Sequence, residues 1–264
     1  DPFLGNIVTG ILIAILVAGV IFGGIKRIGL VAGRIVPLMV LIYLLGGLGI
    51  LFKNLDQIGS IINLVFSDAF TGNAVVGGVV GEVIRQGIRR AVFSNEAGLG
   101  TEVMAHGAAK TKEPVREGLV AMLGPFIDTI LVCSITAFAI LVSGVWNDPS
   151  LNGVTMTARA FSQELGIVGD IILFFAVFSF SITTMFGQSY YGAKCTGFLF
   201  GSRWKSNYNW FYVLSTIIGA TVSISIVINL IDGMYAIMAI PTMVSTLLLA
   251  PKVMAEARRY FSTI

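Results

Sequence analysis

The sequence predicts an all-helical integral membrane protein, and its composition and its long uncharged stretches carry that prediction. Hydrophobic residues make up 56% of the 264 residues, and charged residues make up only 12%. Soluble domains carry about 25% charged residues. The mean hydropathy of +0.90 points to a membrane protein as well. This composition excludes a soluble enzyme, a nucleic-acid binder and a disordered chain.

Six stretches are long and apolar enough to predict membrane-spanning helices, since a crossing needs about 20 such residues. They are too long for the core strands of a soluble protein. The third contains a single charged residue, Asp128. The stretches cover residues 2–25, 35–52, 118–147, 171–193, 206–231 and 233–251.

The segment between the second and third of these stretches follows another pattern. Residues 54–72 contain a short amphipathic piece, which predicts an external helix lying at the membrane interface. Residues 73–109 mix glycines with six charged side chains and resemble a poor membrane helix. Charged residues inside a membrane are costly and mark functional sites, so this segment is a functional candidate if it crosses.

The basic residues predict the orientation of the spans. If the loop after the first span is cytoplasmic, 12 of the 17 Lys and Arg residues lie inside, two lie outside and three lie in the 73–109 segment. That ratio requires residues 73–109 to cross once. We therefore expect seven crossings, with the first residue outside and residues 252–264 as a cytoplasmic tail.

The run from Phe93 to Thr101 is the first candidate site. Its Ser and Asn compete with the helical backbone for hydrogen bonds, and two glycines weaken the helix further, so we expect a break near the middle of the bilayer. Freed peptide groups need a partner, and an amino-acid zwitterion with Na⁺ would satisfy both their N–H and their C=O groups. The alternative is a kinked helix in which Glu96 pairs with Arg89 or Arg90.

A polar stripe on the 171–193 span is the second candidate site. Its members recur at spacings of three and four residues and therefore share one helix face: Ser181, Thr184, Gln188 and Tyr191. The adjacent hydroxyls of Thr183 and Thr184 suit a Na⁺ ion that has shed its water. The alternative is hydrogen bonding between helices, at about 0.6 kcal/mol per contact.

Asp128, the two cysteines and the single histidine limit the kinds of site that the chain can form. Asp128 must pair with an arginine, bind a cation or carry a proton, because an isolated carboxylate in a membrane is costly. Cys133 and Cys195 lie in apolar stretches and predict no disulfide framework. The single histidine, His106, excludes a multi-histidine metal site.

Several motifs resemble the sodium:alanine/glycine symporter family. The most specific is the run Ala-Val-Phe-Ser-Asn-Glu-Ala-Gly-Leu-Gly-Thr at residues 91–101, followed by Ala-His-Gly-Ala-Ala at 105–109. The segments at residues 23–28, 121–129 and 187–192 resemble the family too. Together these motifs extend through nearly the whole chain.

The resemblance implies a LeuT-type fold of two inverted five-helix repeats in the plasma membrane. It implies import of small neutral amino acids, alanine (including D-alanine) or glycine, coupled to Na⁺ by alternating access. This chain would cover about the last seven transmembrane helices, with residues 1–53 ending the first repeat and residues 73–251 forming the second. The N-terminal part of the transporter, which holds the family's first broken helix, would then be a required partner.

The resemblance also implies roles for single residues. The substrate would be bound at the break and on the polar stripe by Ser94, Asn95, Glu96, Gly98 and Gln188. Thr183 and Thr184 would bind Na⁺, and Asp128 lies where a second ion can be held. Gln188 stands where family members often have Trp, which leaves the size of the substrate open. The residues themselves leave a rival open, a proton-coupled symporter in which Glu96 or Asp128 carries the proton.

Overall fold

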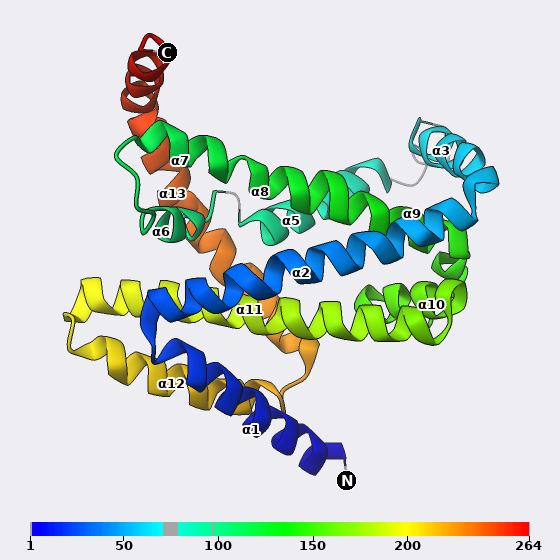
Figure 1. Ribbon diagram of the computed structural model, residues 1–264, viewed down its shortest axis with the longest axis horizontal. Helices are drawn as coiled ribbons and strands as arrows, with labels where there is room; N and C mark the ends of the chain where they lie inside the picture. Colours follow the sequence, from blue (N-terminus) through cyan, green and yellow to red (C-terminus); the bar gives the residue numbers. More distant parts are fainter. Residues whose placement is uncertain (1, 71–78, 97, 264) are drawn as a thin grey trace. The chain divides into compact units, whose positions relative to one another are not determined.

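A computed structural model describes residues 2–70, 79–96 and 98–263, and those residues form helices joined by short turns (Figure 1). The predicted all-helical class is thus confirmed. In chain order the α-helices are α1 (Pro2–Ile21), α2 (Gly24–Lys53), α3 (Leu55–Phe70), α5 (Val79–Asn95), α6 (Glu102–His106), α7 (Pro114–Ala121), α8 (Leu123–Pro125), α9 (Ser134–Ser143), α10 (Gly153–Leu165), α11 (Ile167–Phe200), α12 (Trp204–Gly219) and α13 (Ile224–Phe261). A π-helix, η1 (Phe126–Cys133), links α8 to α9, and a 3₁₀ turn, η2 (Val145–Asn147), follows α9.

Within the described ranges, five helices are long and apolar enough to cross a membrane. They are Phe3–Ile21, Gly24–Lys53, Pro114–Ser143, Ile167–Phe200 and Ile224–Phe261. The first four correspond to predicted spans. The expected total of seven crossings is not confirmed, and two segments account for the difference.

The first of these is the end of the chain. The predicted boundary between the spans 206–231 and 233–251 is wrong. Helix α12 already ends at Gly219, after 16 residues, and α13 then runs for 38 residues. The sequence also predicts an external cap and turn at Asn229 and Asp232. That prediction is wrong, since both residues lie inside α13. A helix satisfies its backbone groups internally, which favours its continuation through an apolar layer despite two polar side chains.

The second is the predicted crossing at 73–109. Residues 71–78 and Ala97 lie outside the described residues. So does Gly77 of the motif Gly77-x-x-x-Gly81, for which the sequence predicts a small-residue packing face. From Val79 the segment forms α5, a break and the five-residue α6. The predicted helix within residues 54–72 is observed as α3, over Leu55–Phe70.

The loop expected around Lys26 to Arg34 is helical instead. The chain turns earlier, at Phe22 and Gly23, and α2 begins at Gly24, whose φ is +68°. Lys and Arg are good helix formers, and their long stems reach polar surroundings from a helix that enters an apolar layer. The charged residues of this segment therefore do not mark a helix boundary.

The described residues divide into two compact units. The first unit is drawn from residues 1–35, 96–121 and 181–264, and the second from residues 36–95 and 122–180. In the first unit α1 packs along α12. Both helices also contact the part of α11 that belongs to this unit, which begins at Ser181. The core there is formed by Ala14, Val17, Ile21, Ile28, Ile182, Phe186 and Val213.

Close packing between α1 and α12 depends on Gly10. A Cβ at Gly10 would lie 2.9 Å from the Cβ of Ala220, so any larger residue would push the helices apart. The spacing Gly19-x-x-x-Gly23 also predicts a small-residue face where another helix can approach closely, but the described residues show no helix contact there. A Cβ at Gly19 would meet nothing within 4 Å, and one at Gly23 would meet the side chain of Arg27.

The second unit has its own core around Tyr43 of α2. The Tyr43 ring stacks on Phe161 with centroids 5.3 Å apart, and its hydroxyl lies 2.6 Å from Thr136 Oγ1. At the end of α2, Lys53 Nζ lies 3.2 Å from Glu164 Oε2, which also accepts a hydrogen bond from Asn54. These contacts fasten α2 to α9 and α10.

Candidate functional site

The predicted helix break lies where it was expected. Helix α5 ends at Asn95, and α6 begins only at Glu102. Between them Glu96, Gly98 and Gly100 have φ values of +51°, +77° and +82°. A positive φ is uncommon outside glycine, so Glu96 is held in its conformation by its surroundings. The backbone here leaves helical hydrogen bonding and turns, with the Leu99 N–H donating to the Glu96 carbonyl at 3.1 Å.

The backbone beside Gly98 is approachable. A Cβ added to Gly98 would meet no atom within 4 Å. Gly100 differs, because a Cβ there would lie 3.1 Å from Thr242 Oγ1 on α13. The Thr242 hydroxyl also lies 3.3 Å from the Leu99 carbonyl, which ties the turn to α13. One glycine of the motif therefore leaves open space, and the other permits close packing.

Glu96 and Gln188 form the polar centre of the first unit. Gln188 of α11 donates from Nε2 to Glu96 Oε1 at 2.8 Å, and both side chains are half-buried. Gln188 also hydrogen-bonds the Tyr235 side chain on α13. The structure thus joins a residue of the predicted polar stripe to a residue of the predicted break, 92 positions apart.

A buried hydroxyl at the end of the break has no hydrogen-bond partner among the described residues. Thr101 is only 5% exposed, and none of the described residues hydrogen-bonds its Oγ1. An unsatisfied buried polar group costs about 1–3 kcal/mol. The first unit therefore retains a buried hydroxyl that a polar ligand or a water molecule would satisfy.

Replacing Thr101 by valine tests whether that hydroxyl is unsatisfied. Because valine keeps the shape and removes the unpaired group, we expect Thr101→Val to stabilise the protein by about 1 kcal/mol, seen as a higher midpoint of thermal unfolding. Thr9→Val, on an exposed position of α1, serves as the matched control and should change little. A lower midpoint for Thr101→Val would mean that the hydroxyl already has a partner.

A second polar cluster lies in the second unit, where α5 meets the π-helix η1. Ser94 Oγ donates to Asp128 Oδ2 at 2.5 Å, and Asn95 Nδ2 donates to Thr129 Oγ1 at 2.9 Å. Asp128 is half-buried. The sequence predicts that this isolated carboxylate needs a partner, and in the structure that partner is the Ser94 hydroxyl. Helices of the π type are rare and often occur at functional sites.

The predicted ion-binding threonines lie on α11, one turn before Gln188. Thr183 is half-buried and Thr184 is exposed. Within the part of the chain that the structure describes, no three His, Cys, Asp or Glu side chains gather in a way that could hold a metal ion. Any cation held here would be bound by hydroxyl and carbonyl oxygens.

Sequence reasoning missed four polar residues of these clusters. Three of them had a local signal: Thr101 closes the motif, Thr129 follows Asp128, and Thr242 follows a proline inside a helix. Tyr235 had no such signal, because only the fold brings α13 beside α11. A hydroxyl next to a recognised motif residue was the cue that could have found the other three.

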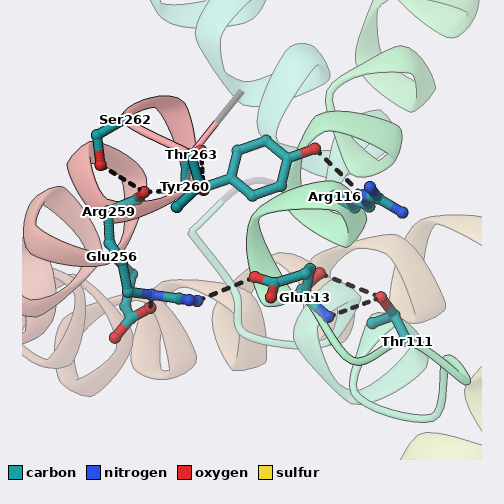
Figure 2. Close-up of polar contacts among 8 residues, drawn as sticks. All are labelled: Thr111, Glu113, Arg116, Glu256, Arg259, Tyr260, Ser262 and Thr263. Atoms are coloured by element: carbon teal, nitrogen blue, oxygen red, sulfur yellow. Dashed lines mark hydrogen bonds and ion pairs between the residues drawn. The ribbon is translucent and has the colours of Figure 1, made fainter.

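A third polar cluster joins α13 to the segment that leads into α7 (Figure 2). Arg259 Nη2 lies 2.9 Å from Glu113 Oε2, and Arg116 Nε donates to the Tyr260 hydroxyl at 3.2 Å. Nearby, His106 Nδ1 lies 2.7 Å from Glu117 Oε1. Tyr260 is buried, whereas the ion pair is largely exposed. Because exposed ion pairs contribute little to stability, the tyrosine contributes more to holding α13 against this segment.

Comparison with known proteins places the chain in a family. The family described as the sodium:alanine symporter family matches residues 3–264. Nearly the whole chain is matched, so the expectation that it corresponds to a C-terminal part, with a missing N-terminal part as partner, is not borne out. The helices and the match together describe a multi-pass protein of the plasma membrane.

Individual relatives agree with this match. The chain is 41% identical to the sodium/alanine symporter AgcS of Methanococcus maripaludis, over 96% of this chain and 56% of the relative. It is 36% identical to an uncharacterized transporter of Haemophilus influenzae, over 98% of this chain and 58% of the relative. It is 32% identical to the probable sodium/glutamine symporter GlnT of Bacillus subtilis, over 98% of this chain and 55% of the relative. The chain thus spans little more than half the length of these relatives, and it belongs to the sodium:alanine symporter family.

Proposed function

We propose that the chain serves Na⁺-coupled symport of a small neutral amino acid, alanine or glycine, by alternating access. The observation that carries the proposal is the broken helix, with its freed peptide groups and a charged side chain beside open space at Gly98. The relatives named above are transporters, which are not enzymes. Their names supply the substrate classes, and the geometry of the first unit supports a zwitterion.

The chemistry of the break suits an amino acid. Freed N–H groups favour the carboxylate of the substrate, and freed carbonyls together with the Glu96 carboxylate favour its ammonium group. Gln188 orients Glu96 through their hydrogen bond. The unpaired Thr101 hydroxyl adds a buried polar group that a bound zwitterion would satisfy. Ser94 and Asn95, which directly precede the break, complete the proposed substrate-binding residues with Gly98.

Two positions are proposed for the co-transported ion. The Thr183 and Thr184 hydroxyls on α11 would hold Na⁺, which gains about 2.3 kcal/mol per 100 mV on entering the cell. Asp128 with Ser94, in the second unit, offers a carboxylate and a hydroxyl for a second ion. In this proposal Na⁺ is cargo that stabilises the substrate-ready state.

The proposed architecture is of the LeuT type, with two inverted five-helix repeats. Residues 1–53 would end the first repeat, residues 54–72 would lie at the external interface, and residues 252–264 would form the cytoplasmic tail. The second repeat, residues 73–251, would begin with a discontinuous helix, and the break between α5 and α6 supports that assignment.

Uptake into proteoliposomes tests the proposal. Radiolabelled L-alanine should accumulate when a Na⁺ gradient is imposed and should stop accumulating when choline replaces Na⁺. Excess unlabelled D-alanine, glycine or L-glutamine, added in turn, would then define the substrate range at Gln188. Accumulation that follows a pH gradient without Na⁺ would instead favour the proton-coupled rival, and the absence of saturable uptake would contradict symport.

A further inference from the structure

A pocket in the first unit lies away from the broken helix. It sits where α1 turns into α2, beside the last turns of α11 and the beginning of α12, and encloses about 240 Å³. Figure 1 shows the start of α2, the end of α11 and the start of α12 at the same side of the first unit. One wall is apolar and comes from the α1–α2 turn: Ile21, Phe22, Ile25 and Ile28.

Basic residues line the pocket as well. Lys194 of α11 and Lys205 of α12 both line it, together with the Asn209 amide. No Asp or Glu is among the lining residues, and no described carboxylate forms an ion pair with either lysine. Two unpaired positive charges beside one cavity favour an anion.

Neighbouring contacts hold both lysines near the pocket. The Lys194 ammonium lies 5.5 Å from the centre of the Tyr190 ring, which also lines the pocket. The stem of Lys205 packs over Gly197, where an added Cβ would lie 2.2 Å from the lysine Cε. Both side chains are thus directed by contacts within the unit, and their charged ends remain exposed.

Aromatic residues beside the pocket indicate its depth in the membrane. Phe22 of the apolar wall contacts Trp210 with ring centroids 4.8 Å apart, and Trp204 and Trp210 are both more than half exposed. Exposed tryptophans concentrate at the level of the lipid headgroups. The abundance of Lys and Arg at this end predicts the cytoplasmic leaflet, which carries anionic lipids.

We propose that this pocket binds one anionic phospholipid. Lys194 and Lys205 would hold its phosphate, Asn209 would donate a hydrogen bond, and the first part of an acyl chain would lie along Ile25 and Ile28. Charge complementarity selects an anion, and the apolar wall at headgroup depth selects a lipid over a soluble phosphate. The site is separate from the broken helix and does not depend on the proposed transport.

Native mass spectrometry of the purified full chain in detergent tests this site, with phosphatidylglycerol and phosphatidylcholine of identical acyl chains as probes. We expect phosphatidylglycerol to be retained and the Lys194→Gln/Lys205→Gln variant to lose that retention roughly tenfold or more, because two charges near a membrane surface dominate such binding. The matched control, Lys110→Gln/Lys112→Gln, removes the same charge from an exposed loop outside the pocket and should retain the lipid.

A second variant separates the pocket from general attraction between charges. Ala193→Phe fills the cavity and keeps both lysines, so it should lose phosphatidylglycerol as the double variant does. Equal loss in both lysine pairs, equal retention of phosphatidylcholine, or unchanged binding by a folded Ala193→Phe protein would overturn the proposal. Displacement of the lipid by glycerol phosphate would identify a soluble-phosphate site and would overturn it too.

Discussion

Glu96→Gln is expected to reduce Na⁺-dependent alanine uptake by at least roughly tenfold. The substitution keeps the size of the side chain and removes the charge that the substrate's ammonium group would meet. Hydrogen bonds to charged groups contribute about 1.5–3 kcal/mol, and 1.4 kcal/mol corresponds to a factor of ten. The measurement is initial uptake into proteoliposomes at a fixed Na⁺ gradient.

Glu96→Gly provides the matched control for the backbone. Glycine adopts the φ of +51° without strain. This variant therefore removes the carboxylate and also removes the backbone strain at residue 96. If the carboxylate is required, both variants lose uptake while the glycine variant remains folded. Full activity of Glu96→Gly would contradict the assignment and leave the residue with a purely conformational role. Retained Na⁺-driven uptake in Glu96→Gln would also remove it as the proton carrier of the rival mechanism.

Thr184→Ala should raise the Na⁺ concentration for half-maximal uptake by roughly tenfold. Its hydroxyl is exposed on α11, and loss of one oxygen ligand costs on the order of 1 kcal/mol or more. Alanine is the better helix former, so the helix itself should not suffer. Thr184→Ser keeps the oxygen and should stay close to the parent protein. An unchanged Na⁺ dependence in the alanine variant would take the ion away from this threonine.

The break and the polar stripe could be predicted because their causes are local. Ser94, Asn95 and the glycines that follow oppose a helix through their own side chains and backbone freedom, whatever surrounds them. A helical repeat likewise places Thr184 and Gln188 on one face without any tertiary information. Both features were therefore visible in a short window of sequence.

What the sequence could not provide was the pairing of distant groups and the extent of the helices. The hydrogen bond between Gln188 and Glu96, and that between Ser94 and Asp128, join segments whose approach depends on the whole fold. The end of α12 at Gly219 has no proline to mark it, whereas Asn229 and Asp232 resemble a turn and lie within α13. Helix ends in an apolar layer follow tertiary packing more than local composition.

Helix α13 reaches from the broken segment to the third polar cluster, where Tyr260 contacts Arg116. On α13, Thr242 contacts the turn at Leu99, and Tyr260, 18 residues later, contacts Arg116. At 1.5 Å per residue those contacts are about 27 Å apart, close to the thickness of the hydrocarbon layer. Helix α13 therefore connects the two sites rigidly: a change in its tilt at the turn would strain the contacts that Glu113 and Arg116 make with its far end.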